Sequence, residues 1–225
     1  WVRIMGQIVY YFWSYFRVSN RFDPMSFVVP SGNFGNAYAG YISKKMGLPI
    51  KKIIIGSNKN DILTRFFKTG KMKIKKTLTS LSPSMDIQVS SNFERLLFDF
   101  YENGKMIKRL FFNLENKKEF SISETHLKNM RKFFGYGKLS DAETKKTISQ
   151  IYDRYKLIID PHTAVGISVG NRELDHKDKR IYLATAHYSK FLKTVKESVK
   201  RKVSYPVKLE KILKHFKVNG LIVGH

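Results

Sequence analysis

The sequence predicts an α/β fold in which helices cover a parallel sheet and a mostly helical stretch is inserted. An apolar run at 26–29, helix-like sequence at 36–46 and a β-branched run at 51–57 form one strand–helix–strand unit. Strand-like sequence returns at 180–185 and is followed by another amphipathic helix. The stretch 71–150 between these parts carries helix patterns instead.

These patterns divide the chain into three parts. Residues 1–70 are expected to form the first part of the α/β domain, residues 71–150 the helical insertion, and residues 151–225 the return to the α/β domain. Continuous apolar runs are typical of parallel strands that are covered on both faces, and the crossover between them should be right-handed. The expected architecture is therefore a sheet between two helical layers.

Several local signals mark helix ends. Gly47 and Gly70 stand where C-cap glycines belong. Ser140 and Glu143 have the spacing of a capping box, and the Asp-Pro pair at 160–161 is a favourable helix start. These signals predict helices at 36–46, 58–70, 140–155 and after 160, with further helices at 91–104, 123–134 and 208–216.

The chain begins with an apolar segment, 4–16, which predicts a buried or amphipathic helix over 1–17. The segment is too short to span a bilayer, which takes about 20 residues, and it lacks the small-residue cleavage site of a signal peptide. The first residue is Trp1 rather than Met, and helix-like sequence begins there at once. We therefore expect 1–225 to be a piece of a longer polypeptide.

Composition restricts the chemistry. The chain has 225 residues and 42% hydrophobic content, enough to bury a sizeable core. It has no cysteine, which excludes disulfides, cysteine-based zinc sites and thiol catalysis. The absence of cysteine is compatible with a reducing compartment, and we expect a cytoplasmic location.

The net charge of +24 raises the question of an anionic partner. The 31 lysines and 11 arginines are spread along the chain without one dominant block, and no nucleic-acid recognition motif accompanies them. A compositional bias toward Lys and Ile explains the charge equally well. We expect no specific nucleic-acid partner and no membrane partner; steep salt dependence of oligonucleotide binding would favour the nucleic-acid alternative.

The stretch "PSGNFGNAYAG" (30–40) links the first strand to the helix after it. Gly32 and Gly35 allow a tight turn and a close approach of the backbone to a ligand. A glycine turn at a helix start presents free N–H groups and the positive end of the helix dipole, which together form a phosphate cradle. The lysine of a P-loop, the spacing of a dinucleotide fingerprint and a magnesium-binding acid are all missing. This indicates a phosphate that is anchored and not transferred, as in a cofactor.

The stretch 27–70, which contains this cradle, resembles the pyridoxal-phosphate-binding part of threonine synthase. The resemblance continues in "LSPSMDIQVSSNFERLLFDF" (81–100), "IIDPHTAVGI" (158–167) and "LATAHYSKF" (183–191). It therefore covers nearly the whole chain. Tyr188 stands where the family more often has Pro, a departure that affects no catalytic role.

This resemblance implies a type II pyridoxal-phosphate fold, the three-layer sandwich of the tryptophan synthase β type, present here in part. It also implies a carbon–oxygen lyase that converts O-phospho-L-homoserine and water to L-threonine and phosphate. No metal is expected. The residues that it assigns to the cofactor are Ser31, Gly32, Asn33, Phe34, Gly35 and Asn36 around the phosphate, and Thr185 beside the pyridine nitrogen.

The Schiff-base lysine that such enzymes require is missing from the matched stretches. Lys44 and Lys45 fall on the helix behind the cradle and do not match the family's catalytic motif. We therefore expect no catalytic residue in this chain, the lysine upstream of Trp1, and the missing N-terminal part of the same polypeptide as a partner. The isolated chain should then be inactive.

Alternatives remain at this point. The cradle could be an ordinary glycine turn, the chain a non-catalytic truncated anion-binding module, or the enzyme a lyase of another β- or γ-substituted amino acid. Asp86 and Asn92 could position substrate, although Asn92 also suits a helix cap. His162 and His187 could contact a ligand or serve helix starts, and Lys190 is a candidate for the substrate phosphate.

Overall fold

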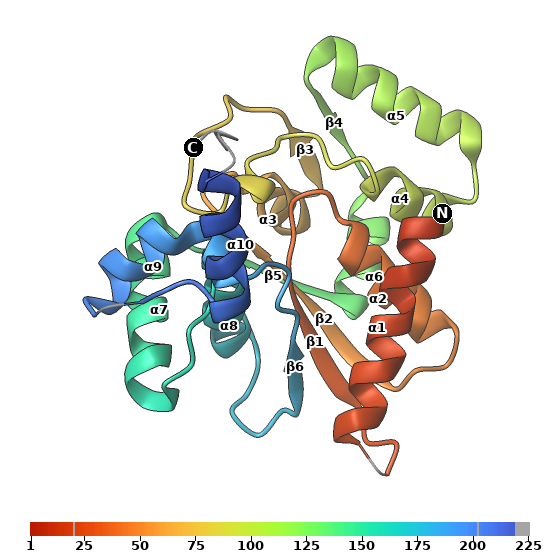
Figure 1. Ribbon diagram of the computed structural model, residues 1–225. Coiled ribbons are helices and arrows are strands. Elements are labelled where there is room, and N and C mark those ends of the chain that lie inside the picture. Colours follow the sequence, from red (N-terminus) through yellow and green to blue (C-terminus); the bar gives the residue numbers. More distant parts are fainter. Residues whose placement is uncertain (20, 202, 219–225) are drawn as a thin grey trace.

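The computed structural model describes residues 1–19, 21–201 and 203–218. A four-stranded parallel sheet of order β5-β2-β1-β6 lies at its centre, with helices on both sides (Figure 1). The predicted α/β fold is thereby confirmed. The strands are β1 (Met25–Pro30), β2 (Ile50–Ser57), β5 (Phe134–Lys138) and β6 (Arg180–Tyr182).

Helices form the layers above and below the sheet. On one face α8 (Pro161–Glu173) contacts every strand of the sheet, and α7 (Asp141–Tyr155) and α9 (Leu192–Val199) pack outside it. The opposite face is covered by α2 (Gly35–Lys45), α3 (Ile62–Thr69) and α6 (Glu124–Phe133). The remaining elements are α1 (Val2–Val18), β3 (Lys71–Lys73), η1 (Pro83–Met85), α4 (Phe93–Tyr101), α5 (Gly104–Lys117), β4 (Glu119–Ser121), η2 (Tyr188–Phe191) and α10 (Val207–Val218).

Strand β1 shows why the sheet requires cover on both faces. All six of its residues are buried. Phe27 and Val29 belong to the large core with α2 and α3, whereas Val28 belongs to a second core with Val165 and Val169 of α8. Alternate side chains of a strand point to opposite faces, so an uninterrupted apolar run is what two covered faces require.

The stretch 71–150 contains an element that the sequence analysis missed. Strand β5 lies within this predicted insertion, yet it pairs with β2 along the edge of the main sheet. Its sequence, FGYGK, has two glycines and no β-branched residue, so the strand signal of its two aromatic residues is weak. Only β3 and β4 form a separate antiparallel pair, and α5 projects from the body of the molecule (Figure 1).

Helix α1 buries one face and exposes apolar side chains on the other. Ile4, Tyr11 and Tyr15 are buried, and α1 packs on α2. Of the two alternatives that the sequence left open, buried or amphipathic, the structure shows the amphipathic one, because the opposite face exposes large apolar side chains: Val2, Met5, Val9, Tyr10, Trp13, Phe16 and Val18. Among the described residues, no helix is long and apolar enough to cross a membrane.

Most helix ends lie where the local signals predict them. Gly47 and Gly70 follow α2 and α3 with positive φ values of 101° and 71°. Ser140 and Glu143 exchange both hydrogen bonds of a capping box at the start of α7. Asp160 caps α8 through its carboxylate.

Tyr11 of α1 packs against the first turn of α2 and is hydrogen-bonded to it. Its ring is fully buried and lies 4.7 Å from the ring of Phe27, and its hydroxyl donates to the carbonyl of Asn36 at 2.6 Å. Burial raises the pKa of this phenol. Gly40 makes room for the ring, since a Cβ there would lie 2.7 Å from Tyr11 Cε1. The close contact of α1 and α2 therefore depends on a glycine.

We predict that Gly40→Ala destabilises the chain by about 1–3 kcal/mol, because the added methyl group overpacks against a buried ring. Urea unfolding measures the change in the free energy of unfolding. Gly6→Ala in α1 is the matched control: a Cβ there meets nothing within 4 Å, so this variant should gain about 0.5–1 kcal/mol from helix propensity. An unchanged midpoint for Gly40→Ala would contradict the packing argument.

Candidate cofactor site

A cavity of about 720 Å³ opens where β1 ends and α2 begins. Its walls come from the start of α1, the loop 80–92, the first turn of α8 and the segment after β6. Every residue that the sequence assigns to the cofactor lines it. These residues are Ser31, Gly32, Asn33, Phe34, Gly35, Asn36 and Thr185.

The turn before α2 leaves backbone donors free. Gly35 is the first residue of α2, and the first N–H groups of a helix have no carbonyl partner within it. These groups stand at the positive end of the helix dipole. Ser31 ties the turn to the sheet by donating its N–H to Gly56 O at 3.0 Å, and its hydroxyl accepts from Phe34 N at 3.2 Å. The turn has the features of an anion site.

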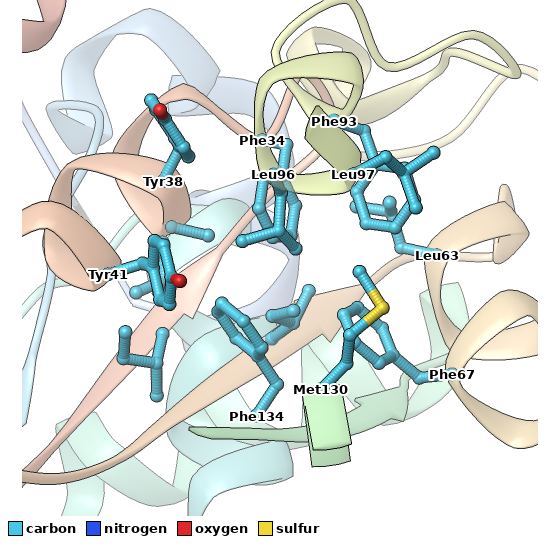
Figure 2. Close-up of a cluster of buried hydrophobic side chains, with 14 of the residues drawn as sticks. Phe34, Tyr38, Tyr41, Leu63, Phe67, Phe93, Leu96, Leu97, Met130 and Phe134 are labelled. Carbon is cyan, nitrogen blue, oxygen red and sulfur yellow. The ribbon is translucent and has the colours of Figure 1, made fainter. Parts of the chain in front are cut away.

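Phe34 holds this turn in place. Its backbone is left-handed, with φ 62° and ψ 3°, a conformation that disfavours a non-glycine residue by about 1–2 kcal/mol. Its ring is fully buried, with its centroid 5.0 Å from that of Phe93 and 5.7 Å from that of Phe134. Figure 2 shows the ring pointing into an aromatic cluster with Phe67 and Leu96 nearby. Burial of the ring offsets the backbone strain.

Gly32 is the closest point between the turn and the loop 80–92. A Cβ on Gly32 would lie 2.9 Å from the Cα atom of Met85 in η1. Backbone of that kind cannot move aside as a flexible side chain can. Only glycine fits, and it leaves the peptide groups of the turn accessible from the cavity.

The loop 80–92 is joined to the turn by a second set of contacts. Asn33 Oδ1 accepts from the N–H and the hydroxyl of Ser91 at 3.1 and 2.9 Å. The carbonyl of Asn33 accepts from Asn92 Nδ2 at 3.0 Å. Asn92 stands at the N-cap position of α4, as the sequence allowed, but its side chain makes no capping bond there. Asn92 instead closes one wall of the cavity.

The Asp86 carboxylate holds this loop in place by accepting several hydrogen bonds. Its Oδ1 atom accepts from Asn58 Nδ2 at 2.7 Å and from Asn60 Nδ2 at 2.9 Å, and its Oδ2 atom accepts from Ser80 N at 2.8 Å. Asn58 and Asn60 are buried. Asp86 does not line the cavity, so the structure gives it a supporting position and not a substrate contact.

The charge at the cavity comes from arginine. Arg3 and Arg95 are the cationic residues among the described ones that line it. The guanidinium carbon of Arg95 lies 4.9 Å from the centre of the Trp1 ring, close enough for a cation–π interaction. Sequence reasoning missed both arginines, although Arg95 lies within a stretch that carries the resemblance.

No described lysine lines the cavity. Lys44 donates its ammonium to the carbonyl of Ile50, and burial lowers its pKa. The Lys45 ammonium lies 5.7 Å from the ring centre of Tyr41. Both lysines point away from the cradle, as predicted. Lys190, the candidate for a substrate phosphate, is exposed and is not brought to the cavity.

Two polar atoms that line the cavity have no protein partner. Gln7 Oε1 and His162 Nε2 are both buried and make no hydrogen bond in the described part of the chain. Gln7 is the polar residue within the apolar run of α1, and a lone polar side chain in such a run is the signal that could have revealed it. Unpaired buried atoms of this kind are suited to contact a polar ligand.

The Asp160 carboxylate organises the first turn of α8 beside these atoms. Its Oδ1 atom accepts from the backbone N–H of His162 at 2.8 Å and lies 2.8 Å from His162 Nδ1. The hydroxyl of Thr163 donates to Oδ2. Burial opposes ionisation of Asp160, but the hydrogen bonds from His162 and Thr163 outweigh it, so the pKa of this carboxyl is lowered.

Thr185 and His187 both follow β6, and only Thr185 lines the cavity. Thr185 lies just beyond β6, which is shorter than predicted, and its side chain is exposed. His187 caps η2, where its ring accepts from Ser189 N at 3.2 Å. This is the helix-start role that the sequence left open for His187. Backbone donors, two arginines and unpaired polar atoms together fit a phosphate-bearing polar molecule.

A larger, open groove of about 1270 Å³ lies beside α4 and α5. Its walls are mainly apolar, with Ile74, Phe98 and Phe111 among them. None of the residues predicted for the cofactor lines it. The chemistry of the turn therefore belongs to the smaller cavity.

Comparison with known proteins gives this cavity a context. The sequence family described as "Threonine synthase, C-terminal" matches residues 163–217. The threonine synthase of Eremothecium gossypii is 41% identical over 219 residues, which cover 88% of this chain, and that of Saccharomyces cerevisiae is 40% identical over a similar stretch. The chain is related to the threonine synthases.

Solved structures of this family share the fold. The PLP-bound threonine synthase from Brucella melitensis superposes with a TM-score of 0.91 at 38% identity and covers 95% of this chain. The yeast threonine synthase gives a TM-score of 0.89. The fold is therefore the type II fold of pyridoxal-phosphate enzymes, as the resemblance implied. The chain spans 43% of the length of the two relatives named above and 46% of the Brucella chain.

We predict that Asp86→Ala lowers the free energy of unfolding by about 2–4 kcal/mol, because it removes an acceptor that the buried amides of Asn58 and Asn60 share with Ser80. Chemical unfolding measures this loss. Asp153→Ala, at an exposed position on α7, is the control and should change stability by less than about 0.5 kcal/mol. Equal midpoints for the two variants would show that the Asn58–Asn60–Asp86 network does not stabilise the loop.

Proposed function

We propose that the cavity binds pyridoxal 5′-phosphate and that this chain is the cofactor-binding part of a threonine synthase. The reaction would convert O-phospho-L-homoserine and water to L-threonine and phosphate, in the cytoplasm. One observation carries the proposal: a strained glycine turn, with free backbone donors, lines one cavity with every residue that the resemblance assigns to the cofactor.

The phosphate of the cofactor would lie at the start of α2. Backbone N–H groups at the start of α2, from Gly35 and Asn36, are available to it, whereas the N–H of Phe34 is already donated to the Ser31 hydroxyl. The helix dipole favours the negative charge of the phosphate. Neither the backbone N–H groups nor the helix dipole requires a side chain to become ordered on binding. The cradle therefore provides binding energy without a large entropic cost.

The pyridine ring would extend from the cradle toward Thr185. A hydroxyl, unlike a carboxylate, does not hold a ring nitrogen firmly protonated, so Thr185 would moderate the electron-withdrawing power of the ring. The cofactor, when bound, supplies an electron sink for carbanion chemistry at the amino acid. Arg3 and Arg95 would orient the anionic groups of the substrate at the same cavity.

Two alternatives are less well supported. A non-catalytic anion-binding module would need only the turn, whereas Gln7 and His162 also leave polar atoms unpaired along the cavity. A lyase of another amino acid would share this cofactor site, but the named relatives at 40–41% identity are threonine synthases.

We predict that Gly32→Ala weakens binding of pyridoxal 5′-phosphate to this chain at least tenfold, because the added methyl group collides with the backbone of Met85 and displaces the turn. Equilibrium dialysis with detection by absorbance measures the affinity. Gly104→Ala is the control, since a Cβ there meets only Phe98, at 4.0 Å. The proposal fails if the unmodified chain does not bind the cofactor, or if Gly32→Ala binds it equally well.

We further propose that the lysine which bonds covalently to the cofactor lies outside residues 1–225, upstream of Trp1. The absence of a described lysine from the cavity wall supports this, as do the engaged ammonium groups of Lys44 and Lys45. The partner of this chain would then be the N-terminal part of the same polypeptide. Without it, the chain should bind the cofactor but not turn over substrate.

Borohydride reduction in the presence of pyridoxal 5′-phosphate, followed by peptide mass mapping, tests the position of this lysine. We expect no single stoichiometrically labelled lysine in this chain. A polypeptide extended upstream to the length of its relatives should carry one pyridoxyl-lysine, before Trp1. A specific label within 1–225 would overturn the assignment.

A further inference from the structure

His162 is a buried histidine with one nitrogen engaged and the other free. Its side chain is 3% exposed, and its Nδ1 atom lies 2.8 Å from Asp160 Oδ1. Its Nε2 atom is buried, makes no hydrogen bond within the described part of the chain, and belongs to a residue that lines the cavity. Capping of α8 by the Asp160 carboxylate accounts for the Nδ1 contact but leaves Nε2 unexplained.

The contact with Asp160 determines which nitrogen carries the proton. A carboxylate is only an acceptor, so Nδ1 must be the donor in this pair. In the neutral ring, Nε2 then presents a lone pair. A buried acceptor without a partner destabilises a protein, which indicates that the atom serves a ligand.

The ring of His162 packs on a segment that also lines the cavity. Its centroid lies 5.0 Å from that of Phe191, on the segment that follows β6. Thr185 and Ala186 of the same segment line the cavity as well. His162 therefore packs on the segment that also carries Thr185, whereas the free backbone donors lie at the start of α2.

We propose that His162 is a ligand-contact residue whose Nε2 atom accepts a hydrogen bond from the ring hydroxyl of the bound cofactor. This inference rests on the proposed function. Asp160 is the positioning residue, since it orients the ring and keeps the proton on Nδ1.

Nuclear magnetic resonance on the unmodified chain tests this contact directly. With ¹⁵N-labelled histidine, long-range ¹H–¹⁵N spectra report the protonation of each ring nitrogen. We expect the Nδ1–H form for His162, and a shift of its Nε2 resonance when pyridoxal 5′-phosphate is added. Inorganic phosphate should shift the backbone amides from Gly32 to Asn36 without moving that resonance.

A pair of variants separates the contact from a structural role. His162→Asn keeps an N–H group for Asp160 and lacks the Nε2 atom; it should bind pyridoxal 5′-phosphate about tenfold more weakly and inorganic phosphate unchanged. His162→Gln restores an acceptor at the position of Nε2 and should regain part of the affinity. His176→Asn, at an exposed position, is the control and should match the unmodified chain.

The outcomes distinguish this inference from the proposed function. If pyridoxal 5′-phosphate shifts the cradle amides but not His162 Nε2, the inference is wrong and the cofactor site stands. If it shifts neither, both are wrong. An Nε2–H form in the free chain, or unaltered affinity in a folded His162→Asn variant, would also overturn the inference.

Discussion

The site depends on the burial of one aromatic ring. Phe34 takes a left-handed backbone conformation immediately before α2, and its ring packs at full burial against Phe93 and Phe134. The strain is local, whereas the packing that offsets it comes from α4 and β5, far along the sequence. A turn held in this way presents its backbone donors before any ligand arrives. Preorganised donors bind an anion without reorganisation. Packing in the core therefore determines how well the cavity can bind an anion.

The loop 80–92, which forms the wall next to the turn, is held by polar contacts instead. Asp86 gathers the amides of Asn58 and Asn60, and Asn33 joins the turn to Ser91 and Asn92. Hydrogen bonds have directions, so they can define the shape of a loop that has little apolar surface to bury. Different interactions thus stabilise the two walls. Packed aromatic rings hold the turn before α2, and hydrogen bonds hold the loop 80–92.

Helix α1 contributes to the cavity in a third way. Its buried side supplies Tyr11, which supports α2, and Gln7, whose free oxygen lines the cavity. Its other side exposes aromatic and aliphatic residues. The hydrophobic pattern of 4–16 predicted the helix but not its orientation, because nearly every position is apolar and periodicity then carries little information. Contact with α2 selected the buried side.

Local chemistry was sufficient for part of this protein. The glycine turn, the strands around it, the helix caps and the resemblance to threonine synthase all follow from residues that are neighbours in the chain, since backbone conformation and strand burial are short-range properties. The tertiary structure alone decided that the side chain of Asn92 bonds to the turn at Asn33, that β5 joins the main sheet, and that Arg95, Gln7 and His162 line one cavity. These facts depend on contacts between distant segments and on which polar atoms remain unpaired after folding. Neither the contacts between distant segments nor the set of unpaired polar atoms is defined until the chain has folded.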